Sequence, residues 1–124
     1  ANGLTPVGVP LVGDDYAVDV DGLLATDAGV IYLCSPNNPT ATPVTRDAVR
    51  RVVERARGLV ILDEAYAEFV AADPDARAEV FTPEAPGWGR VLVLRTLSKA
   101  FGLAGLRVGY GVGSAAVVRE VEKA

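Results

Sequence analysis

Lys99 stands in a polar series whose residue types suit nucleophilic chemistry. Two hydroxyl residues, Thr96 and Ser98, precede it, and Arg107 lies eight residues further along the chain. A lysine in a poorly solvated site loses pKa and becomes an amine nucleophile. Hydroxyls and a guanidinium fork are suitable ligands for phosphate. The series therefore indicates either a solvated turn or a site where the lysine reacts while its neighbours hold an anion.

Asp63 and Tyr66 form a second polar group elsewhere in the chain. Asp63 directly follows the aliphatic run 59–62. An ionised carboxylate beside a core strand is costly unless a cation pairs with it. A ligand with a protonated ring nitrogen, an electrophilic carbonyl and a phosphate would satisfy Asp63, Lys99 and the hydroxyls together. Pyridoxal phosphate carries these groups, and proteins bind it through a lysine Schiff base and a partner on the ring nitrogen.

Three apolar runs must position these side chains. They span residues 29–34, 58–66 and 90–99, and each is continuous before polar residues end it. Continuous apolar runs are typical of parallel strands covered on both faces. Between the first two, Thr45 predicts the N-cap of a helix that Gly58 ends, with a core face made of Val49, Val52, Val53 and Ala56. The predicted fold class is α/β, a partial doubly wound, mostly parallel sheet with helices on both faces.

The carboxyl ends of these strands are the expected place for a ligand, as in other open parallel sheets. Polar residues follow each run at its carboxyl end. If the strands are parallel, one crevice receives all of them: Asn37, Asn38, Asp63, Tyr66, Thr96, Ser98 and Lys99.

The remaining segments carry simpler predictions. Residues 5–11 predict an edge strand, because Pro6 and Pro10 would interrupt a central one. Residues 14–26 predict a loop and a short amphipathic helix, and residues 71–89 a helix end and a long exposed connection that includes Trp88. Residues 106–113 predict a further short strand, and Ser114 predicts the N-cap of a last helix.

Three blocks of this sequence resemble those of a known family. "SPNNPT", "DEAYAEF" and "RTLSKAFGLAGLRVGY" are similar to the signature blocks of fold-type I pyridoxal-phosphate-dependent aminotransferases of class I/II, and closest to the histidinol-phosphate aminotransferase branch. The resemblance covers residues 7–124. It implies a large-domain fold of the pyridoxal-phosphate transferase type.

The resemblance also implies a role for each matching residue. Lys99 forms the Schiff base and moves a proton between the substrate and the cofactor. Asp63 pairs with the ring nitrogen, while Tyr66 and Asn38 bind the phenolic oxygen of the ring, and Asn38 could also meet the substrate carboxylate. The 5′-phosphate is bound by Thr96, Ser98 and Arg107.

The same resemblance suggests what surrounds this chain. Residues 1–124 correspond to the central part of the large domain, without the N-terminal segment and the small C-terminal domain. Family members are homodimers that use an amino donor and a 2-oxo acid, here histidinol phosphate with 2-oxoglutarate in histidine biosynthesis. Aromatic aminotransferases and a phosphothreonine decarboxylase use near-identical blocks and remain alternatives. The family usually has glycine where this chain has Ala41, which predicts a strained left-handed turn.

Composition excludes several other classes. The net charge of −4 argues against nucleic-acid binding, and no apolar run is long enough for a membrane span. One cysteine, no histidine and the absence of a signal-peptide pattern favour a cytoplasmic protein without a metal site. The run before Asp63 also fits a Walker B strand of a nucleotide hydrolase, but no Gly-Lys-Ser or Gly-Lys-Thr triplet accompanies it.

A structural interpretation stays open beside each functional one. Asp63 fits a helix N-cap, Tyr66 a core aromatic and Arg107 a surface arginine. Asn38 fits a turn built on two prolines, and Thr96 and Ser98 fit loop caps. Two further residues have no assigned chemistry: Arg95, a charge at a strand end, and Cys34, which is expected to be a small buried hydrophobe.

Overall fold

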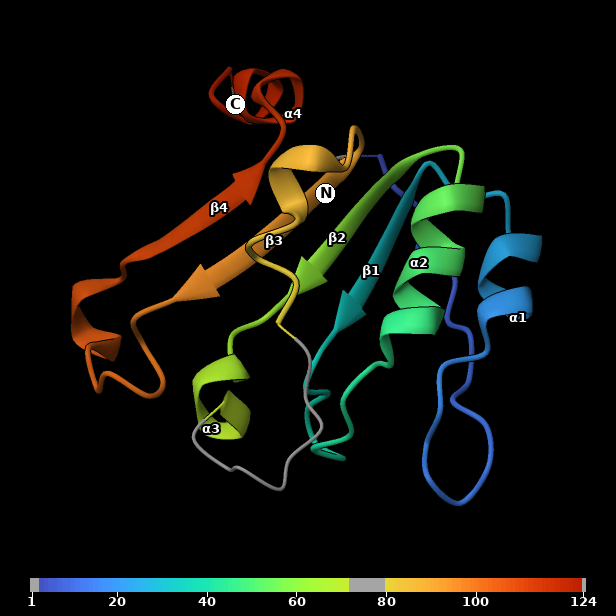
Figure 1. Ribbon diagram of the computed structural model, residues 1–124, viewed down its shortest axis with the longest axis horizontal. Helices are drawn as coiled ribbons and strands as arrows, with labels where there is room; N and C mark the ends of the chain where they lie inside the picture. Colours follow the sequence, from blue (N-terminus) through green and yellow to red (C-terminus); the bar gives the residue numbers. More distant parts are fainter. Residues whose placement is uncertain (1–2, 72–79, 124) are drawn as a thin grey trace.

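A four-stranded open sheet forms the centre of the molecule, with strand order β1-β2-β3-β4. The computed structural model describes residues 3–71 and 80–123. The three apolar runs become β1 (Val30–Cys34), β2 (Leu59–Asp63) and β3 (Val91–Thr96), which are parallel to one another. β4 (Gly109–Gly113) pairs antiparallel with β3. This mixed sheet confirms the predicted fold class, and Figure 1 shows β4 running in the direction opposite to the other three strands.

Short helices connect the strands. They are α1 (Val20–Ala25), α2 (Arg46–Arg55), α3 (Ala67–Ala71) and α4 (Ala115–Val121), together with the 3₁₀ turns η1 (Ala85–Gly87) and η2 (Ala104–Leu106). The expected short helix within residues 14–26 is α1, and the expected last helix is α4, where Ser114 accepts from the backbone of Val117. Among residues 3–71 and 80–123, no helix has the length and apolar character that crossing a bilayer requires.

Helix α2 forms for the reasons that its sequence suggested. Thr45 is the N-cap, and its hydroxyl accepts from the backbone N–H of Ala48 at 3.3 Å. Val49, Val52 and Ala56 recur on one face and are buried in the core. The predicted role of Gly58 is wrong, because the helix already ends at Arg55 and Ala56 is extended.

Gly58 is required by a close approach between two chain segments. A Cβ at this position would lie 2.0 Å from the carbonyl oxygen of Gly29, which no side chain can occupy. Gly29 precedes β1 and Gly58 precedes β2. The glycine therefore lets the amino ends of the two strands meet.

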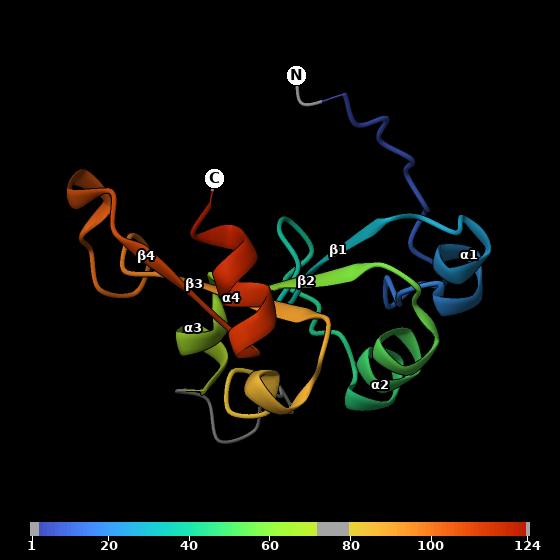
Figure 2. The same cartoon turned by 90° about the horizontal axis from the view of Figure 1, so that it is seen from above.

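The core lies between the sheet and α2. Ile31 and Leu33 of β1 are buried against this layer, whereas Val30 and Tyr32 alternate with them and are exposed. Figure 2 shows α2 and η1 on the same side of the sheet. The other face also receives a helix, because Leu92 of β3 is buried on that side and Val117 of α4 lies 3.6 Å from where a Cβ of its strand partner Gly113 would be. We call this face, which carries the exposed Val30 and Tyr32, the open face.

The connection before β3 is less exposed than its composition suggested. Phe81 and Ala85 are fully buried, and Trp88 packs against the same core with its ring 6.2 Å from that of Phe81. The surface-loop prediction for Trp88 is therefore wrong. The proline- and acid-rich composition misled it, because these few apolar residues cap the core while their neighbours face solvent. The part of this predicted connection at residues 72–79 lies outside the described residues.

The predicted edge strand at residues 5–11 does not form. The segment carries no strand, and the nearest pairing is an isolated antiparallel bridge between Val12 and Ala17. Pro6 and Pro10 remove two backbone donors from this segment, so it cannot offer a regular ladder to β1.

Candidate active site

The carboxyl ends of the three parallel strands meet at one edge of the sheet, as the sequence predicted. In the ladder Cys34 pairs with Asp63, and Asp63 pairs with Leu94 of β3. The loops that follow β1, β2 and β3 leave from this edge, on the side of α3 (Figure 1). This edge therefore gathers most of the candidate residues.

Asn38, Tyr66 and Lys99 form a cluster drawn from the three loops. Nδ2 of Asn38 donates to the hydroxyl of Tyr66 at 3.3 Å. Nζ of Lys99 lies 5.2 Å from the centre of the Tyr66 ring, within the range of a cation–π contact. Tyr66 lies in the turn before α3 and is partly buried, whereas Asn38 and Lys99 are exposed. Lys99 is thus more solvated than the sequence suggested, and its amine lies over the ring of Tyr66.

Asp63 ends β2 with both carboxylate oxygens engaged. Oδ1 accepts from the backbone N–H of Ala65 at 3.0 Å, and Oδ2 accepts from the hydroxyl of Tyr32. Partial burial raises the pKa of Tyr32, and the hydrogen bond and negative charge of Asp63 raise it further. The carboxylate is therefore held in place by one backbone donor and one phenol. The sequence analysis did not single out Tyr32.

Thr96 and Ser98 are close to each other at the start of the loop after β3. Oγ1 of Thr96 accepts from the backbone N–H of Ser98 at 3.1 Å and donates to the carbonyl of Val108 at 3.4 Å. Thr96 is thus a loop cap in this structure, which was the structural alternative. The hydroxyl lies at the end of the sheet where β3 and β4 separate, because Thr96 ends β3 and pairs with Gly109 at the start of β4.

Arg107 is placed differently from the other candidates. It follows η2 in a left-handed conformation with φ of 53°, is exposed, and donates through Nη1 to the carbonyl of Ala104 at 3.3 Å. The structure therefore gives this guanidinium a partner in its own loop, and among the described residues no hydrogen bond joins it to Thr96 or Ser98.

Arg95 has a role that the sequence analysis missed. Its guanidinium contacts Glu64 at 3.0 Å and also binds Glu68, while Glu64, fully buried, accepts from the backbone of Phe81 and the hydroxyl of Thr82. Burial lowers the pKa of Arg95, but the two carboxylates outweigh it and raise that pKa overall. This network joins the ends of β2 and β3 directly beside Asp63 and Thr96.

Two other expectations concern local detail. Ala41 has a φ of 59°, so the predicted left-handed turn after the asparagine block is present. Cys34 is only half-buried and its thiol donates to the carbonyl of Pro36 at 3.3 Å, so the prediction of a buried hydrophobe holds in part. Burial is the main cause that raises the pKa of this thiol.

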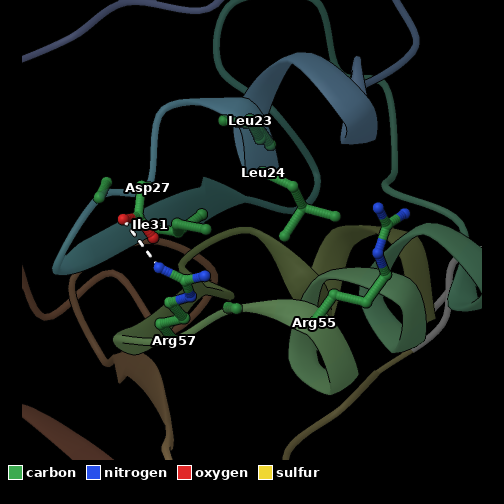
Figure 3. Close-up of a pocket in the computed structure, with 8 residues that line it drawn as sticks. Leu23, Leu24, Asp27, Ile31, Arg55 and Arg57 are labelled. Atoms are coloured by element: carbon green, nitrogen blue, oxygen red, sulfur yellow. Dashed lines mark hydrogen bonds and ion pairs between the residues drawn. The ribbon is translucent and has the colours of Figure 1, made fainter.

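Two cavities differ in their relation to this edge. A cavity of about 220 Å³ lies beside the cluster and is lined by Asn38, Tyr66 and Phe69, among others. A larger one of about 360 Å³ lies at the amino ends of β1 and β2, where Arg57 pairs with Asp27 at 3.1 Å (Figure 3). The first adjoins the candidate residues, and the second is remote from them along the sheet.

The chain belongs to the family "Aminotransferase class I and II", whose sequence pattern matches residues 1–124. It is 47% identical over 126 residues to an aromatic amino acid aminotransferase of Rhodococcus jostii, covering 98% of this chain and 34% of that protein. It is 44% identical over 111 residues to a histidinol-phosphate aminotransferase of Methanopyrus kandleri, covering 87% of this chain and 27% of that protein. The chain thus spans about a third of the length of these curated relatives, with 34% for the first.

A solved structure matches the fold as well. The histidinol-phosphate aminotransferase from Sinorhizobium meliloti in complex with pyridoxal-5′-phosphate superposes with a TM-score of 0.72 at 35% identity, covering 95% of this chain and 32% of that one. The family and this fold do not fit the Walker B alternative, which we discard.

Proposed function

We propose that the protein is a pyridoxal-phosphate-dependent aminotransferase, with Lys99 as the residue that binds the cofactor covalently. Family membership and the likeness to a pyridoxal-phosphate complex support this proposal. The observation that carries it is the cluster itself: an amine, a phenol and an amide from three separate loops lie together at the edge where Asp63 ends β2.

The donor set fits the cofactor in its chemistry. When bound, pyridoxal phosphate supplies a protonated ring that accepts electrons from the substrate's α-carbon. Asp63 would keep the ring nitrogen protonated, because a carboxylate favours a neighbouring positive charge. Tyr66 and Asn38, already in contact with each other, would donate to the phenolic oxygen of the ring. Lys99 would carry the proton at the substrate's α-carbon.

Phosphate binding requires more rearrangement than ring binding. Thr96 and Ser98 already share one loop turn, in which Oγ1 of Thr96 accepts from the backbone N–H of Ser98. To bind the phosphate, the Thr96 hydroxyl would exchange the carbonyl of Val108 for the anion. Arg107 would have to break its exposed hydrogen bond to the carbonyl of Ala104. A charge-assisted contact with phosphate is stronger than such a bond.

The amino donor is proposed to carry a ring. The sequence blocks and the Sinorhizobium meliloti structure favour histidinol phosphate, with 2-oxoglutarate as acceptor, whereas the identity to the Rhodococcus jostii protein favours an aromatic amino acid. A homodimer in the cytoplasm remains the expectation for the whole protein. Half-transamination with histidinol phosphate or phenylalanine, followed by loss of the cofactor's visible absorbance, distinguishes the two donors. A protein converted by neither donor contradicts the proposed substrate class.

The lysine assignment has a direct test, because the chain contains only two lysines, Lys99 and Lys123. We expect pyridoxal phosphate and borohydride to label Lys99, as read by peptide mass. Lys99→Ala should remove the visible absorbance and the label, and the matched control Lys123→Ala should retain both. Labelling of Lys123 alone, or equal labelling of the two lysines, would overturn the assignment.

A further inference from the structure

Tyr32 and Asp63 face each other across two neighbouring strands. In the parallel register Tyr32 pairs with Ile61 and Cys34 pairs with Asp63, so Tyr32 and Asp63 are diagonal neighbours on one face of the sheet. Aromatic side chains can reach a diagonal neighbour across a strand pair. The phenol does so here, and its hydroxyl donates to Oδ2 of Asp63.

The ring of Tyr32 contributes little to the core. The residue is 54% exposed on the open face, between the buried Ile31 and Leu33. A tyrosine that serves packing would bury its ring and leave its hydroxyl in water. Tyr32 has the opposite arrangement, since the ring is accessible and the hydroxyl is bonded to a carboxylate. Its position is therefore better explained by the hydroxyl than by the ring.

The two donors to Asp63 determine how its carboxylate is oriented. Oδ1 is bound by the backbone of Ala65 at 3.0 Å and Oδ2 by Tyr32, so rotation about the last side-chain bond breaks both contacts. An ionised carboxylate has about four lone-pair sites, and these two bonds use only one on each oxygen. Asp63 can therefore accept a further donor while it stays fixed.

The phenol remains a proton donor over a wide pH range. Partial burial, the hydrogen bond and the charge of Asp63 together raise the pKa of Tyr32. Among the described residues, the other titratable group that affects this pKa is Cys34, which lies on the same strand and face and also raises it.

We propose that Tyr32 is a positioning residue for Asp63, and that its hydroxyl holds the carboxylate in the orientation that receives the ring nitrogen of the cofactor. The inference rests on the proposed function, because it assumes that Asp63 meets this nitrogen. Tyr32 itself need not touch the cofactor. Its effect must therefore depend on both the carboxylate and the ring nitrogen.

The experiment compares Tyr32→Phe with the matched control Tyr110→Phe, at a second exposed tyrosine of the same sheet. Binding is measured with pyridoxal phosphate and with its analogue that has carbon in place of the ring nitrogen. We expect Tyr32→Phe to weaken the cofactor about tenfold, the size of one hydrogen bond to a charged group, and to leave the analogue unchanged. Tyr110→Phe should change neither.

An Asp63→Asn background completes the test. There Tyr32→Phe should have no further effect on cofactor binding, because the charge that it orients is gone. Unchanged cofactor binding in Tyr32→Phe, or equal weakening of both ligands, overturns the positioning role while the proposed function stands. Failure of the wild-type chain to bind the cofactor overturns both. In the cofactor-free protein, spectrophotometric titration should show the Tyr32 phenol ionising at lower pH in Asp63→Asn, and an unchanged titration would contradict the coupling.

Discussion

The guanidinium of Arg95 lies 3.0 Å from the carboxylate of Glu64, and Glu64 is fully buried. The same carboxylate accepts from the backbone of Phe81 and the hydroxyl of Thr82. Three chain segments thus converge on one buried charge: the end of β2, the end of β3 and the segment before η1. Asp63 and Thr96 are the direct neighbours of this pair in sequence, so the pair sets how the two strand ends are spaced.

Removing the cation of this pair should destabilise the fold. Arg95→Leu leaves Glu64 buried without its countercharge, and we expect a loss of about 3 kcal/mol in the free energy of unfolding. Urea denaturation measures this loss. Arg50→Leu, at an exposed position of α2, is the control and should change stability by less than about 0.5 kcal/mol. A change below about 1 kcal/mol for Arg95→Leu would show that water or a rearranged side chain compensates Glu64.

This pair also shows where the sequence was insufficient. A glutamate after a strand normally faces solvent, and only the return of residues 80–82 to the sheet buries Glu64. Such a contact between distant segments leaves no local pattern. β1, β2, β3 and α2 were predictable because their apolar spacing and the Thr45 cap are local signals.

The candidate site also has one part that the sequence predicts and another that it does not. The convergence of Asn38, Tyr66 and Lys99 followed from the rule that parallel strands end at one edge. The partner of Asp63 did not, because finding Tyr32 requires the register between β1 and β2. Roles for Thr96, Ser98 and Arg107 in phosphate binding stay predictions.

Phe81 should be a major contributor to the core. It is fully buried, its ring lies 6.2 Å from that of Trp88, and the guanidinium of Arg46 lies 5.3 Å from its centre. Phe81→Ala should cost about 3–5 kcal/mol, as cavity-forming substitutions of buried aromatics do. The control is Phe101→Ala, where the exposed ring should cost much less. Thermal unfolding compares the two, and similar shifts would mean that the segment before η1 is not part of the cooperative core.

Replacing Ala41 with glycine should stabilise the folded protein. Its φ of 59° is in the left-handed region, where an L-residue costs about 1 kcal/mol relative to glycine. Ala41→Gly should therefore raise the free energy of unfolding by up to about 1 kcal/mol, measured in urea. The same change within α4, Ala116→Gly, should lower it by about 0.5–1 kcal/mol. A loss of stability in both variants would argue that the turn is relaxed at Ala41.

Tyr32 should make stability depend on alkaline pH. Its folded-state pKa is raised above the ordinary value of 10.0, so the folded protein keeps a proton that the unfolded chain releases. The unfolded state then binds fewer protons, and the free energy of unfolding falls as pH rises. This contribution is fully present below about pH 10 and is lost as pH increases towards the folded-state pKa.

The measurement is a series of urea unfolding curves between pH 8 and about 11.5 on the wild type, Tyr32→Phe and Tyr110→Phe, a range that spans the ordinary tyrosine pKa. Other tyrosines and lysines titrate in all three proteins, so the difference between curves isolates each phenol. Wild type and Tyr110→Phe should lose stability more steeply above pH 10 than Tyr32→Phe, because only Tyr32→Phe lacks the shifted phenol. Parallel curves for all three would mean that Tyr32 ionises equally in the folded and unfolded chains, and that its hydroxyl is not held by Asp63 in solution.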